Sequence, residues 1–153
     1  ISDKMKISPE LLQKLMETIS GNDIYLAERS LNALKPEVLT DDLQLELATI
    51  FENSGFLQKR LIIQKLKETK QLSPEVVQLF SLAMNNMNGT LVKTTLELFK
   101  IHKIEVEQVE AQVSELLKNK NRFIANQAYQ FLNRAEIIDK RTIKTIEKYK
   151  KRN

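Results

Sequence analysis

The chain has 153 residues, of which 42% are hydrophobic and 29% charged, a balance that excludes disorder over most of its length. The formal net charge is +4, and no apolar run approaches the roughly 20 residues that a membrane-spanning helix needs. Cysteine is absent, which excludes disulfides, a thiol nucleophile and thiolate metal sites, and fits the reducing compartment of an intracellular, cytoplasmic protein.

An all-α fold is expected because strand-forming residues nowhere alternate with polar ones at a period of two. Gly and Pro number only three each, a composition suited to tightly connected helices. We expect residues 1–153 to form a single domain. The chain begins at Ile1 rather than Met and reaches its first expected helix within a few residues, so we favour a fragment of a longer protein.

Four similar two-helix units are expected in chain order, and a last helix follows them. In each unit, an apolar-periodic stretch, a short polar break and a second apolar-periodic stretch succeed one another. The units lie at 8–39, 40–72, 73–104 and 105–134, and residues 135–153 hold the last helix, expected at about 141–150. A period of roughly 32 or 33 residues is typical of helical solenoids, in which each unit buries its apolar face against its neighbours.

The first unit carries clear helix signals. Ser8 precedes Pro9, and this pair predicts an N-cap followed by the first helical position. The apolar stripe of this helix is Leu11, Leu12, Leu15, Met16 and Ile19. The apolar residues of the second helix, capped by Asp23, are Leu26, Ala27, Leu31 and Leu34.

The other three units repeat these signals at equivalent positions. Their inter-helix breaks centre on Gly55, Asn88 and Asn121. Apolar residues of the first helix in the third unit are Leu79, Leu82 and Ala83, and Met84 and Met87 are expected to fill the core. Alignment by the breaks gives two apolar columns, Leu31, Ile63, Leu96 and Tyr129 in one and Leu34, Leu66, Phe99 and Leu132 in the other.

The pattern around each break resembles a HEAT-type repeat over about residues 8–132. That family places Asp or Asn at the inter-helix turn, then Val and Arg, a small residue and a Leu at fixed distances. Good matches are Asn121, Ile124, Ala128 and Leu132, and Asp23, Leu26, Ser30 and Leu34; the poorest are Gly55, Gln58, Ile62 and Leu66. The Arg position holds Ala27, Lys59, Val92 and Ala125. The resemblance implies a right-handed HEAT/armadillo-like α-solenoid, without indicating a subfamily, whose second helices line a concave surface.

Charge differs between the two helices of each unit. The first helices (9–20, 41–53, 74–87 and 105–118) sum to −9, and the second helices (23–35, 56–70, 89–103 and 121–134) sum to +8. The candidate binding residues on the second helices are Arg60, Gln64, Lys67, Lys93, Lys100 and Gln130. We expect a non-catalytic scaffold or adaptor that binds an acidic peptide or helix of another protein there. The alternative is that acidic first helices pair with basic second helices and form only a solvated exterior.

Other functions are less well supported by the sequence. Cationic residues dominate the C-terminus, where they predict a nucleic-acid site as an alternative: Lys140, Arg141, Lys144, Lys148, Lys150, Lys151 and Arg152. A structural spacer and a bacterial effector domain are further alternatives. No catalytic residue, metal site or cofactor is expected, because His102 is the single histidine and Asp41 and Asp42 fit capping of a first helical turn.

Overall fold

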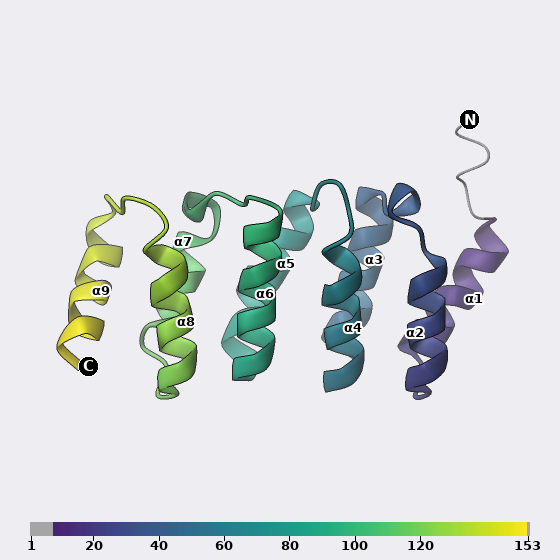
Figure 1. Ribbon diagram of the computed structural model, residues 1–153, viewed down its shortest axis with the longest axis horizontal. Helices are drawn as coiled ribbons and strands as arrows, with labels where there is room; N and C mark the ends of the chain where they lie inside the picture. Colours follow the sequence, from purple (N-terminus) through teal and green to yellow (C-terminus); the bar gives the residue numbers. More distant parts are fainter. Residues whose placement is uncertain (1–7, 153) are drawn as a thin grey trace. The chain divides into compact units, whose positions relative to one another are not determined.

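The computed structural model describes residues 8–152, which form nine α-helices, two short 3₁₀ helices and no strand (Figure 1). The all-α expectation is therefore confirmed. The helices are α1 (Pro9–Ser20), α2 (Ile24–Ala33), η2 (Pro36–Val38), α3 (Asp41–Glu52), α4 (Phe56–Leu66), α5 (Pro74–Ala83), η3 (Met84–Asn86), α6 (Gly89–Ile101), α7 (Val106–Leu116), α8 (Arg122–Leu132) and α9 (Lys140–Arg152). None of these helices is long and apolar enough to cross a membrane.

The chain divides into two compact units, Ile1–Val76 and Val77–Asn153, with the division inside α5. In unit 1, α1 packs against α2 and α3, and α4 packs against α2 and α3. Figure 1 shows α2 and α4 in front of α1 and α3, so this unit has two helical layers. The interior between the layers is filled by Ile19, Leu34, Leu47, Phe51, Ile62, Ile63 and Leu66.

Unit 2 is built in the same way around α7 and α8. Helix α8 packs against α6 and α7, α9 packs against α7, and η3 contacts both α6 and α7. The largest buried side chains are Phe80, Met84, Leu96, Phe99 and Phe131. The rings of Phe99 and Phe131 meet edge to face with centroids 6.4 Å apart, which joins α6 to α8.

Side-chain caps explain where the helices begin. Ser8 Oγ accepts a hydrogen bond from the Leu11 amide at 3.2 Å, and Pro9 occupies the first position of α1. Asp23, Thr40, Asn88 and Asn121 cap α2, α3, α6 and α8 through equivalent bonds. Each cap satisfies backbone N–H groups that have no partner inside the helix. The predicted starts of these five helices are therefore confirmed.

Helix ends differ more from the expectation. Helix α4 ends at Leu66 instead of Lys70, because Glu68 and Thr69 donate their amides three residues back and the last turn tightens. Helix α5 ends at Ala83, and the expected continuation to Met87 becomes the 3₁₀ turn η3. Met84 and Met87 are buried, as expected of core residues.

Burial follows the predicted apolar columns. All residues of the two columns are buried except Tyr129, which is half-buried. Three predicted stripe residues were assigned wrongly: Leu11 is 51%, Leu26 is 47% and Leu82 is 53% exposed. Helix α5 is apolar around most of its circumference, and its buried apolar residues are Val76, Val77 and Phe80.

Two glutamines join segments that are distant in sequence within unit 1. Buried Gln44 donates to the Leu39 and Gln71 carbonyls at 2.9 and 3.0 Å and accepts from the Ser73 amide at 2.7 Å. Gln58, in the poorest HEAT match, donates to the carbonyls of Ile19 and Gly21 at the end of α1. Its amide therefore satisfies carbonyls that an apolar residue would leave unpaired.

Candidate functional site

Three candidate binding residues lie in unit 1, Arg60 and Gln64 on α4 and Lys67 at its C-cap. Arg60 and Gln64 are exposed and Lys67 is half-buried. Their spacing of four and three residues places them on one side of the helix. The Arg60 guanidinium lies 5.7 Å from the centroid of the Phe56 ring, a cation–π contact within α4. Helix α4 contains no carboxylate, so its exposed side is cationic.

A cavity of about 170 Å³ opens between α2 and α4 beside these residues. It is lined by Glu28, Leu31, Asn32, Leu61, Gln64, Lys65 and Glu68. Of the three candidate binding residues in unit 1, Gln64 lines this cavity, and Arg60 and Lys67 do not. The lining combines two carboxylates, one ammonium and two amides, a set that suits a polar chain segment with backbone and charged groups.

Lys65 is part of this cavity and was missed by the sequence analysis. Its side chain is only 5% exposed, and its Nζ lies 3.6 Å from a carboxylate oxygen of Glu68, which is 50% exposed. A buried ammonium needs such a partner because desolvation penalises its charge. The sequence feature that could have identified this ion pair is the spacing of three residues between Lys65 and Glu68, which brings the two side chains together on one helical turn.

The remaining candidate residues lie in unit 2. Lys93 and Lys100 are exposed on α6 and lie two turns apart on one side of that helix. Gln130 is exposed on α8, which packs beside α6. The structure thus brings together Arg60, Gln64 and Lys67 in one unit and Lys93, Lys100 and Gln130 in the other.

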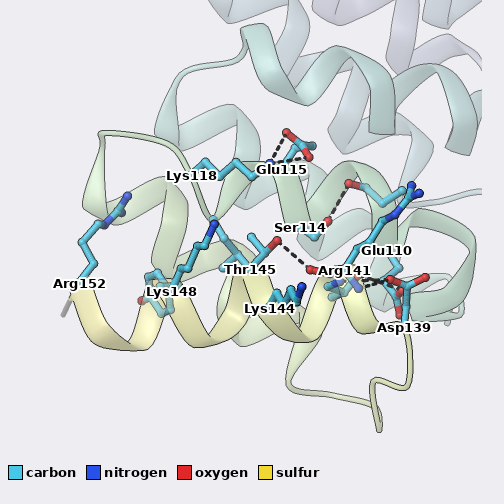
Figure 2. Close-up of a pocket in the computed structure, with 14 residues that line it drawn as sticks. Glu110, Ser114, Glu115, Lys118, Asp139, Arg141, Lys144, Thr145, Lys148 and Arg152 are labelled. Atoms are coloured by element: carbon cyan, nitrogen blue, oxygen red, sulfur yellow. Dashed lines mark hydrogen bonds and ion pairs between the residues drawn. The ribbon is translucent and has the colours of Figure 1, made fainter.

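A larger cavity, of about 640 Å³, lies between α7 and α9 in unit 2 (Figure 2). Helix α9 supplies Arg141, Lys144, Lys148 and Arg152 to its lining, and all four are exposed. Figure 2 shows Arg141 and Lys148 extending from α9 toward α7. These cations could be recognised from the sequence, but the cavity could not, because it depends on the tertiary packing of α9 on α7.

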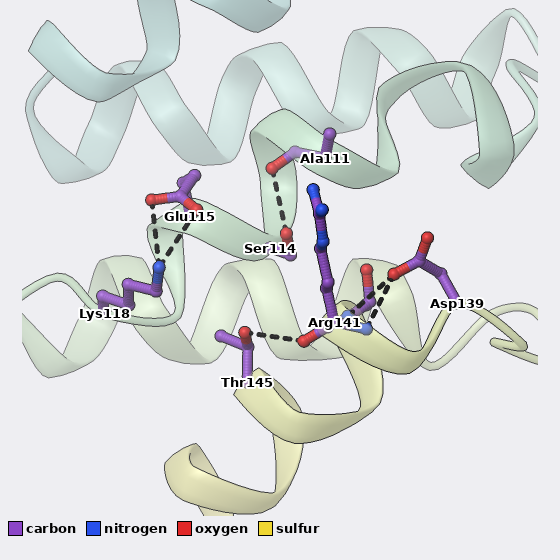
Figure 3. A network of polar contacts seen from close by, with 8 residues as sticks. Ala111, Ser114, Glu115, Lys118, Asp139, Arg141 and Thr145 are labelled. Atoms are coloured by element: carbon purple, nitrogen blue, oxygen red, sulfur yellow. Dashed lines mark hydrogen bonds and ion pairs between the residues drawn. The ribbon is translucent and has the colours of Figure 1, made fainter.

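The carboxylates around this cavity are each engaged by neighbouring groups, and Figure 3 shows the bonds of Asp139 and Glu115. Asp139 Oδ1 accepts from the amides of Arg141 and Thr142 at 2.9 and 3.1 Å and so caps α9. Glu110 accepts from the Thr142 hydroxyl at 3.1 Å, and Glu115 forms an ion pair with Lys118 at 3.1 Å. By contrast, within residues 8–152 no carboxylate lies within ion-pair distance of Arg141, Lys144 or Lys148.

Arg152 and Tyr149 fix the C-terminal part of α9 in place. The Arg152 guanidinium donates to the Asn119 carbonyl at 3.1 Å, and the Tyr149 hydroxyl donates to Asn126 at 3.2 Å. The rings of Tyr149 and Tyr129 stack with centroids 5.0 Å apart. Tyr149 is therefore occupied by protein contacts on the face that stacks on Tyr129.

Groups associated with metal binding or catalysis do not gather in the described part of the chain. Residues 8–152 contain no cluster of three His, Asp or Glu side chains that could hold a metal ion. His102 is half-buried and forms the C-cap of α6. Asp41 and Asp42 lie in the first turn of α3, where their negative charges interact favourably with the helix dipole.

Comparison with protein-family models, with curated proteins and with solved structures gives no match for this chain.

Proposed function

We propose that this chain is a non-catalytic protein-interaction module that binds an acidic peptide or helix through the exposed side of its second helices, α2, α4, α6 and α8. The observation that carries the proposal is that the candidate binding residues on these helices remain largely exposed after the helices have packed. Five of the six candidate residues are exposed, so their side chains are accessible to a partner, whereas Lys67 is half-buried.

Charge supports an acidic partner on two of these helices. Helix α4 presents Arg60 beside the half-buried Lys67 without a carboxylate in the helix, and α6 presents Lys93 and Lys100. Complementary charge steers encounter and suppresses unsuitable partners even where each exposed ion pair contributes little affinity. Gln64 and Gln130 add amide donors and acceptors that can fix the register of a bound backbone.

We also propose that the helix pairs follow the HEAT-like architecture, a right-handed α-solenoid, as the sequence resemblance implies. Support comes from the two-layer packing within each unit and from the buried residues at equivalent repeat positions, Ser30, Ile62, Thr95 and Ala128. The Arg position of the family is apolar and buried at Ala27, Val92 and Ala125, which leaves no room for an Arg ladder.

The test is a charge reversal in each unit, Arg60→Glu and Lys93→Glu, singly and together. The probe is a fluorescently labelled amphipathic helical peptide with glutamates on its polar face, and anisotropy measures its Kd. We expect the double variant to bind at least about tenfold more weakly, because two attractive contacts become repulsive.

The matched control reverses two lysines outside the second helices, Lys14→Glu on α1 and Lys120→Glu between α7 and α8, both exposed. This control keeps the same net charge as the double variant and is expected to bind the peptide with nearly unchanged Kd. Equal affinities for the two double variants, with both folded by circular dichroism, would show that the second-helix surface is not the binding site.

A further inference from the structure

We propose that the cavity between α7 and α9 is a binding site for the phosphate backbone of nucleic acid, used without base specificity. The site is formed by the exposed cations of α9 that line it, Arg141, Lys144, Lys148 and Arg152. It shares no residue with the second-helix surface, so the two proposals stand or fall separately.

Unpaired positive charge is the first argument. The cavity's own carboxylates are engaged by the α9 cap, the Thr142 hydroxyl and Lys118, as described above. Arg141, Lys144 and Lys148 have no such partner among residues 8–152. Arg152 uses one of its guanidinium nitrogens on the Asn119 carbonyl and keeps further N–H donors for a ligand.

Spacing is the second argument. The four cations recur at intervals of three or four residues, so they form one row along α9 with a rise of about 5 Å per step and a length of about 16 Å. A duplex carries one phosphate charge per about 1.7 Å of axis, so roughly ten phosphates fall within that length. Several cations of the row can therefore meet phosphates at once.

The chemistry favours nucleic acid over an acidic peptide at this site. Each exposed ion pair with a peptide carboxylate contributes little affinity, whereas each phosphate contact also releases condensed counterions. Helix α9 offers seven cations and one carboxylate, and its aromatic residue, Tyr149, is stacked on Tyr129. A phosphate backbone binds through charge alone by releasing its counterions, and the stacked Tyr149 explains why no base specificity is expected.

The experiment measures binding of the full chain to fluorescein-labelled probes by anisotropy at several salt concentrations. Probes of about 20 nucleotides are duplex DNA, the corresponding single strand and RNA of the same sequence, and a polyglutamate peptide tests the protein-like alternative. With four phosphate contacts, the slope of log K against log salt is expected to be about −3.6 for duplex DNA and about −2.8 for single strands. A slope near zero, or tighter binding of polyglutamate than of any nucleic acid, would overturn the proposal.

A pair of matched variants locates the site on α9. Lys144→Gln with Lys148→Gln removes two charges from the cavity, and Lys140→Gln with Lys151→Gln removes two exposed charges from the same helix outside its lining. We expect the cavity variant to lose at least about tenfold in affinity and to halve the salt slope, and the control to stay within about threefold. Equal losses in both variants would mean that α9 acts only as a diffuse charge, and the cavity assignment would be wrong.

Discussion

Lys103 adopts a backbone conformation that is unusual for its residue type. Its φ is 55°, in the left-handed region, directly after His102 at the end of α6. The amides of Lys103 and Ile104 donate to the carbonyls of Lys100 and Phe99 at 3.0 and 2.9 Å, the bonding pattern of a Schellman cap. The cap thus requires a conformation that glycine adopts more readily than lysine.

Lys103→Gly is expected to stabilise the fold by about 0.5 to 1 kcal/mol. Relief of the left-handed strain contributes about 1 to 2 kcal/mol, and the greater freedom of glycine in the unfolded chain offsets part of it. The melting temperature should rise by about 2 °C. Lys103→Ala is the control, because it removes the charge and keeps the Cβ; an equal rise for both variants would attribute the effect to charge instead of conformation.

At the residue scale, contacts between residues that are close in sequence could be predicted. The caps at Ser8, Asp23 and Asn121 were predictable because each side chain bonds to amides two or three residues on. Gln44 bonds to residues up to 29 positions away, and this contact depends on tertiary packing. Leu82 was assigned to the core wrongly for a related reason, since periodicity cannot choose among several apolar faces of one helix.

Helix α9 depends on contacts with the rest of unit 2. It has 13 residues and seven cations that repel one another, so by itself it would be marginally stable. Its attachment consists of the bond from buried Thr142 to Glu110, the contacts of Tyr149 with Tyr129 and Asn126, and the bond from Arg152 to the Asn119 carbonyl. The cavity between α7 and α9 could not be predicted, because this attachment determines its shape.

Tyr149→Ala is expected to loosen α9 while leaving α7 and α8 folded. The change removes a ring stack and a hydrogen bond at one end of the attachment, together worth about 1 to 3 kcal/mol. Hydrogen exchange followed by mass spectrometry should show about ten- to a hundredfold faster exchange confined to residues 140–152. Tyr25→Ala, at a tyrosine that is 79% exposed, is the control and should leave α9 unchanged. Unchanged exchange in α9 of the Tyr149 variant would contradict this account of its attachment.

At the scale of the whole molecule, ion pairs and apolar packing contribute differently to stability. The ion pairs Lys65–Glu68 and Lys118–Glu115 each join residues three apart, so they act locally and do not link a first helix to a second. Buried apolar side chains hold each unit together by itself. We therefore expect stability to come mainly from apolar packing between neighbouring helices, as in repeat proteins.

Paired core substitutions test whether stability is local in this sense. Phe131 is fully buried against Phe99 in unit 2, and Phe51 is fully buried in α3 of unit 1. Truncation of either ring to alanine should cost about 3 to 5 kcal/mol. If packing acts locally, Phe131→Ala should accelerate hydrogen exchange about 10²- to 10³-fold in α6 and α8 and leave exchange in α3 and α4 unchanged. Phe51→Ala should accelerate exchange in α3 and α4 and leave α6 and α8 unchanged. Equal acceleration of all helices by either variant would mean that the chain unfolds as one cooperative body and that the division into two units has no energetic meaning.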